Sequence, residues 1–175
     1  MPSYAKFDIW QNTAGVVRQS IVQVVTSVKT DTFTTSSTTP VDVPGLSVAI
    51  TPMSSSSRVL IQGTIYLGID NPSGGAWLMA GFLTRNGTIV SRHDAASNRG
   101  RFFFGTQAPG NNDETIPFPI NFVDSPASTS SNTYSLQIQA ESPRTVYVNR
   151  GVENDGDAAI SGRFVSTIIA MEILG

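Results

Sequence analysis

Cysteine is absent from this chain of 175 residues, and histidine occurs once, as His93. Without thiols the chain has no disulfides, no thiolate metal ligands and no cysteine nucleophile, which suits a reducing compartment. Little is left of the side chains that enzymes use for nucleophilic and acid–base catalysis. We therefore expect a protein that is not an enzyme, with no catalytic residues, no metal site and no cofactor.

Charge and long apolar runs are also scarce. Charged residues make up 14% of the chain and the formal net charge is −2 at pH 7, so neither nucleic acid nor an acidic membrane surface is expected as a partner. No stretch approaches the ~20 apolar residues of a membrane helix. Residues Met1 to Asp8 lack the basic and then apolar pattern of a secretory signal, so we expect no export signal of that type. A surface with so few charges is expected to meet other protein.

What the chain does contain is a series of β-strand patterns. Apolar and β-branched residues alternate at a period of two from Gln19 to Thr30, and segments rich in Ser, Gly, Pro and Asn separate further short runs. Asn86-Gly87 between two apolar runs predicts a hairpin, because both residues tolerate positive φ. Pro117 and Pro119 keep their segment out of the middle of a sheet. The expected strands are 19–30, 41–51, 58–69, 76–84, 88–92, 101–105, 114–123, 133–141, 144–149 and 163–174.

These patterns predict an all-β fold, an antiparallel β-sandwich of jelly-roll type over residues 20–175. Residues 1–19 lack strict periodicity, yet they hold several large apolar side chains. We expect them to form an extended N-terminal arm that docks on a neighbouring subunit or a larger assembly, with folding back on its own domain as the alternative. The apolar side chains of the arm are those of Tyr4, Phe7, Ile9 and Trp10.

Three segments are apolar on both faces of the expected strand: 77–83, 102–104 and 165–174. A sheet with one solvated face alternates instead, so such a strand has to be covered on both sides. We expect the second cover to come from another subunit, and an arm or loop of the same chain is the alternative. Cyclic homo-oligomers are the usual form of such assemblies. The expected interface comprises Tyr4, Phe7, Ile9, Trp10, Trp77, Phe82, Phe102, Phe103, Phe104 and Met171.

Two charged clusters are interpreted as surfaces and not as catalytic sites. Arg92, Arg99 and Arg101, with His93, form a basic cluster that is either a solvated hairpin edge or a contact for acidic groups of a partner protein or an anionic glycan. The acidic segment 153–157 lacks the spaced ligands and distal Glu of an EF-hand. It is expected to be a solvated loop, with a cation site formed on assembly as the alternative.

Several phrases of the sequence, in this order, resemble a β domain that recurs in virion proteins of tailed bacteriophages, particularly those of marine and freshwater bacteria. In that group the domain occurs as a standalone protein or as the distal domain of tail fibres. The resemblance covers most of the chain from about residue 16 to the end. The phrases are VVRQSIVQVVTSVKTDTF (16–33), PGLSVAITPMSSSSRVLI (44–61), LTRNGTIV (83–90), FVDSPASTSSNTYSLQIQA (122–140), TVYVNRG (145–151) and STIIAMEIL (166–174).

The resemblance implies a non-enzymatic structural protein of the virion, assembled in the bacterial host cytoplasm, and similar phage domains commonly form homotrimers. Because no repetitive shaft precedes the domain, we expect a capsid decoration (cement) protein. Its trimers would sit on the shell, and its arms would contact the major capsid protein or another virion protein. A tail-fibre or receptor-binding knob that recognises a host glycan or protein is the alternative. A free carbohydrate-binding module, using exposed Trp10, Trp77 or Tyr147, is a further one.

Overall fold

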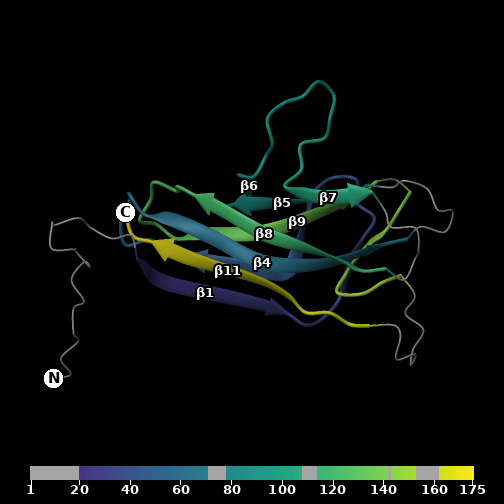
Figure 1. The fold of residues 1–175 in the computed structure, drawn as a ribbon, viewed down its shortest axis with the longest axis horizontal. Helices are drawn as coiled ribbons and strands as arrows, with labels where there is room; N and C mark the ends of the chain where they lie inside the picture. The colour runs from purple at the N-terminus through teal and green to yellow at the C-terminus, as the bar shows by residue number, and fades with distance from the viewer. Residues whose placement is uncertain (1–19, 71–77, 108–113, 142, 153–161) are drawn as a thin grey trace.

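The computed structural model describes residues 20–70, 78–107, 114–141, 143–152 and 162–175, which form two stacked antiparallel β-sheets (Figure 1). These residues include no helix. The strands are β1 (Ile21–Lys29), β2 (Phe33–Thr35), β3 (Val41–Ile50), β4 (Arg58–Ile69), β5 (Leu78–Arg85), β6 (Thr88–Ile89), β7 (Phe104–Gln107), β8 (Ile116–Asp124), β9 (Asn132–Ala140), β10 (Val146–Val148) and β11 (Ser166–Ile173).

The strand order is that of a jelly roll. Sheet I has the order β1-β11-β4, with β8 on the other side of β4, and the short β10 and β2 extend it at the far end of β4. Sheet II has the order β3-β9-β5, with β7 and β6 on the other side of β5. The long strands therefore fall alternately into the two sheets along much of the chain. This confirms the predicted fold class, an antiparallel sandwich of jelly-roll type.

Turn chemistry positions the strands of sheet II. Asn86 (φ 50°) and Gly87 (φ 79°) connect β5 to β6 with two positive φ angles, as a two-residue hairpin requires. Gly45 (φ 82°) lies where β3 shifts register against β9 between Asp42 and Ser47, so the predicted interruption at Pro44-Gly45 is a bulge.

Both edges of sheet I are protected from adding a further strand. Among the described strands β8 pairs only with β4, so Pro117 and Pro119 lie on an edge strand, as their type predicts. At the other edge, Ser27 Oγ of β1 donates a 2.7 Å hydrogen bond to the carbonyl oxygen of Gly45 in β3. The two sheets thus meet along the β1 side of the sandwich.

The core lies between the sheets and takes alternate residues from every long strand. Ile61 and Leu67 of β4 and Leu136 and Ile138 of β9 are completely buried. Because both sheets contribute to one continuous cluster, the domain has a core of its own. The first and last strands pair with each other, and Leu174 N–H donates to the carbonyl oxygen of Ser20, so the described chain enters and leaves at the same end (Figure 1).

Candidate assembly surface

Sheet I presents apolar side chains on the face that points away from the core. In β1 Val22, Val24 and Val28 point outward, and Val24 and Val28 are 58% and 54% exposed, whereas Val25 packs against the core. In β11 the residues of that face are half-buried, whereas Ile168 and Ala170 between them are buried. We call this surface the outer apolar face. It comprises Val22, Val24, Thr26, Val28, Leu60, Gln62, Thr64, Pro119, Asn121, Val123, Thr167, Ile169, Met171 and Ile173.

One row of aliphatic side chains crosses the whole sheet. Val24 of β1 pairs with Met171 of β11, Met171 pairs with Leu60 of β4, and Leu60 pairs with Val123 of β8. Directly opposed residues in an antiparallel sheet have Cβ atoms about 5 Å apart, so these four side chains form a continuous ridge. The ridge has no counterpart on a sheet whose outer side is simply solvated.

The row on one side of this ridge is uncharged and contains Thr26, Ile169, Gln62 and Asn121. The row on the other side contains Ile173, which pairs with the charged residue Arg58. Across four strands the described surface therefore offers mainly hydrophobic contact and short polar groups, with a charge at one end. Such a surface is suited to contact with another protein.

The inner side of β1 explains why its valines point outward. Lys29 is 2% exposed, and its Nζ lies 2.7 Å from Oδ1 of Asp31. This hydrogen bond lowers the pKa of the Asp31 carboxyl. Ser27 also points inward, toward Gly45. A shift of one residue would bring the valines in, but it would leave these polar groups without their partners.

The outer face of sheet II is polar over β9. Its β9 positions are Thr133, Ser135, Gln137 and Gln139, and Gln137 Nε2 donates a 3.0 Å hydrogen bond to Asp42 Oδ1 of β3. This is the alternation expected of a sheet with one solvated face. The two outer faces of the sandwich thus differ in kind, and the apolar one belongs to sheet I.

The predicted second cover of β5 comes from the chain itself, which corrects the expectation that another subunit supplies it. Phe82 points out of the core but is only 4% exposed, and its ring meets the edge of Phe102 at 5.8 Å. Phe103 and Phe104 pack against the core instead, with ring contacts to Phe122 and Phe118. Phe82 is therefore already buried within one copy.

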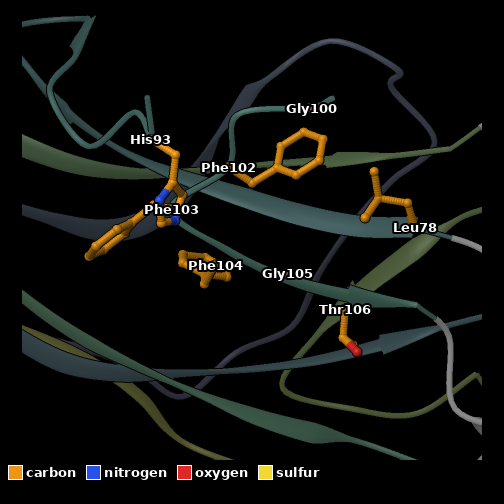
Figure 2. Close-up of a pocket in the computed structure, with 8 residues that line it drawn as sticks. All are labelled: Leu78, His93, Gly100, Phe102, Phe103, Phe104, Gly105 and Thr106. Atoms are coloured by element: carbon orange, nitrogen blue, oxygen red, sulfur yellow. The ribbon is translucent and has the colours of Figure 1, made fainter. Parts of the chain in front are cut away.

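A shallow hollow of about 420 Å³ lies at the base of the segment between β6 and β7. Figure 2 shows Phe102, Phe103 and Phe104 around it, with His93 among them. Arg101 Nε donates to the carbonyl oxygen of His93, which joins the two ends of the segment. Arg92 and Arg99 are exposed on the same segment, which projects from the sandwich in Figure 1. The hollow is aromatic with basic residues nearby.

The remaining candidates divide into placed and unplaced residues. Met171 lies in the ridge of the outer apolar face, where sequence reasoning had grouped it with the phenylalanines. The valines of β1 and Leu60 were missed, although the alternation over 19–30 was visible; a sequence pattern does not say which face of a strand is inside. The residues that lie outside the described part of the chain are Tyr4, Phe7, Ile9, Trp10, Trp77 and the acidic segment 153–157.

Among the residues that the structure describes, no three of His, Cys, Asp or Glu come together in a group that could hold a metal ion. The same residues contain no helix with the length and hydropathy needed to cross a membrane.

Comparison with known proteins gives no family. No family model matches the chain, and no curated protein matches it. Solved structures of infectious bursal disease virus are similar in fold. For the Gx strain the sequence identity is 12% and the TM-score 0.39, and the match covers 99% of this chain and 46% of that one. For the Gt strain the identity is 14% and the TM-score 0.44, and the match covers 100% of this chain and 43% of that one. The structure of T=1 particles derived from that virus is 11% identical in sequence, with a TM-score of 0.40, and the match covers 99% of this chain and 42% of that one. This chain spans less than half of each, and at these TM-scores the likeness carries no functional argument.

Proposed function

We propose that this protein is a non-enzymatic structural protein of a virion and that it acts by packing against other protein. The observation that carries the proposal is the outer apolar face of sheet I, where Val24 and Val28 are more than half exposed beside half-buried Met171 and Leu60. When a partner removes apolar surface of this extent from water, the free energy of the system falls. The resemblance of the ordered sequence phrases to phage virion β domains supports the same role.

The specific form we propose is a homotrimeric capsid decoration protein of a bacteriophage, located in the virion. Residues 1–19 would act as the anchoring arm, and the major capsid protein or another virion protein would be the surface that it contacts. Residue 20 lies at one end of the sandwich beside the C-terminal strand, so an arm leaving there has the whole domain on one side of it. This arrangement suits a domain held above a shell.

A second candidate is a tail-fibre or receptor-binding knob, and the aromatic hollow favours it. Phe102 and His93 offer flat rings, and Arg92 and Arg99 offer charge on the same projecting segment. Rings next to guanidinium groups are suited to a host surface glycan or an acidic protein segment. Under this candidate the exposed end of the molecule, and not the arm, would make the contact that matters.

The primary test is binding to shells of the parent virus that lack this protein. The full chain is expected to bind and to give about three times the 18.6 kDa monomer mass by light scattering. A chain without residues 1–15 is expected to stay folded and oligomeric but to leave the shells unoccupied. Undiminished binding of the truncated chain would show that the arm is not the anchor, and a clean monomer at micromolar concentration would contradict the trimer.

A second measurement separates head from tail. An antibody against a decoration protein is expected to leave adsorption to host cells unchanged, while loss of the protein lowers the resistance of the shell to heat or low salt. An antibody that blocks adsorption, with shell stability unchanged, would instead support the receptor-binding candidate.

A further inference from the structure

We infer that a second copy of this chain covers the outer apolar face of sheet I, so that copies meet through Val24, Met171, Leu60 and Val123. The inference rests on the proposed function, because it names the partner of the same face. It also moves the contact away from Phe82, which is buried within one copy.

The scarcity of charge on this face selects the partner. Ile169, Gln62 and Asn121 continue an uncharged surface on one side of the ridge, and Arg58 lies in the row on its other side. A partner recognised through several charges would find little that is complementary here. A second surface with few charges can approach this face with little like-charge repulsion. Few tightly bound water molecules then have to be removed from either surface. An identical copy supplies such a surface.

The size of the face is also adequate. Four strands about 4.8 Å apart, each about nine residues long at ~3.3 Å per residue, give a plan of roughly 19 Å by 30 Å, on the order of 570 Å². Two exposed residues extend it: Ile21 of the edge strand β1, at 53%, and Val165 directly before β11, at 50%. Small specific interfaces bury up to about 600 Å² on each partner and standard ones about 800 Å². The face therefore reaches the area that a specific contact between two copies needs.

The edges of sheet I favour contact between faces over pairing of strands. Because Pro117 and Pro119 have no N–H group, the free edge of β8 lacks two of the donors that an added strand would use. The β1 edge is closed against β3 by the Ser27–Gly45 hydrogen bond. Copies are thus expected to meet through the faces of their sheets and not edge to edge, with the outer apolar face of each copy turned toward the symmetry axis of the trimer.

Because the chain has no cysteine, single thiols can report on the face. In Val24→Cys, the rate of labelling by a maleimide is expected to fall at least about tenfold from dilute to concentrated protein, as mass action fills the interface. Thr133→Cys, on the polar outer face of sheet II, is the matched control and is expected to label equally fast at both concentrations. Fast labelling of the Val24→Cys thiol at every concentration would overturn the inference.

Charge placed on the ridge gives a second readout. Met171→Asp is expected to lower the mass measured by light scattering to that of a monomer, while Thr133→Asp leaves it unchanged. If Met171→Asp does not fold, Val24→Asp serves the same purpose, because Val24 is 58% exposed on an edge strand. Circular dichroism checks that each variant keeps its fold. An oligomer that survives Val24→Asp would show that copies meet elsewhere.

Other occupants give distinct results. If the thiol of Val24→Cys is protected at all concentrations and deletion of residues 1–19 releases it, the arm of the same chain covers the face and the inference is wrong. Protein that self-associates through this face but never binds shells supports the inference and contradicts the proposed function. Shell-bound protein whose Val24→Cys thiol still labels at full rate contradicts the inference alone.

Discussion

Asp124, the last residue of β8, forms an ion pair with Arg85, the last residue of β5, with 2.6 Å between Oδ2 and Nη1. The pair joins sheet I to sheet II at one end of the sandwich. Tyr134 of β9 donates a 2.7 Å hydrogen bond from its hydroxyl to the same Oδ2. The Asp124 side chain is 13% exposed, so one carboxylate oxygen in a mostly dry site serves two donors. Both donors depend on Asp124.

Replacing Asp124 is therefore expected to cost more than replacing a surface carboxylate. Asp124→Asn keeps the shape but removes the charge, and we expect the free energy of unfolding to fall by about 2 kcal/mol, since Arg85 keeps a poorer partner. Urea denaturation measures the loss. Asp94→Asn is the matched control, because Asp94 is exposed on the segment between β6 and β7, and it is expected to change the midpoint little. Equal midpoints for the two variants would contradict a structural role for the Asp124 pair.

The Tyr134 hydroxyl predicts a loss of stability in alkali. Burial, and then the hydrogen bond to Asp124, raise the pKa of Tyr134 above its ordinary value. Above about pH 10 an unfolded tyrosine releases its proton while folded Tyr134 keeps it, so the free energy of unfolding falls by up to ~1.4 kcal/mol per pH unit. Tyr134→Phe is expected to flatten this decline, whereas Tyr66→Phe, which keeps the ring stacked on Phe164, should leave it as in the wild type. Identical slopes in all three proteins would rule out Tyr134 as the cause.

Two glycines predict graded steric effects. A Cβ at Gly63 would clash with the carbonyl oxygen of Thr167 in the neighbouring strand, and one at Gly81 would clash with the ring of Phe104. A backbone oxygen within a sheet cannot move aside as a ring can. We therefore expect Gly63→Ala to cost about 3 kcal/mol and Gly81→Ala about 1 kcal/mol. Thermal unfolding of both variants shows which of them loses more stability. A larger loss of stability in Gly81→Ala than in Gly63→Ala would contradict the argument.

The three consecutive phenylalanines are expected to differ in their importance to a single copy. Phe104 packs on Phe118 of the core, and Phe102 packs on Phe82 outside it. Phe104→Ala is expected to lower the free energy of unfolding by about 3 kcal/mol, and Phe102→Ala by about half as much. Chemical denaturation at concentrations where the protein is monomeric is the measurement. A dependence of either loss on protein concentration would place that ring in an interface after all.

The sequence alone was sufficient for most of the strands. The expected 58–69 matches β4, the Asn86-Gly87 hairpin is present, and the prolines of β8 lie at an edge. β2 was missed, because Phe33–Thr35 is too short to show a period and forms only through its pairing with β10. The strand expected at 101–105 begins instead at Phe104, since the residues before it leave the sheet to contact Phe82 and Phe122.

The candidate surface was harder to predict, for a physical reason. The alternation in β1 indicates that the strand has two faces, but both faces carry apolar residues. Hydrophobicity alone would predict that the face with more valines points into the core. The orientation is decided by Lys29, which reaches Asp31, and by Ser27, which reaches Gly45. The contact of Ser27 with Gly45 is tertiary, and that of Lys29 with Asp31 joins residues two apart in the sequence; the alternating pattern encodes neither pairing. The two-sided character of 165–174 did predict an apolar outer side for β11, and the structure bears this out for Ile169 and Met171.

The antiparallel pairing of β1 with β11 has a practical consequence for labelling and display. Because Ser20 and Leu174 are joined by a backbone hydrogen bond, any polypeptide attached before residue 20 or after residue 175 starts from the same end of the sandwich. A tag fused at the C-terminus would compete for space with whatever residues 1–19 touch. A peptide meant to point away from that end should be inserted in the loops at the other end of the sandwich. A short linker between residues 20 and 175 would permit circular permutation of the domain.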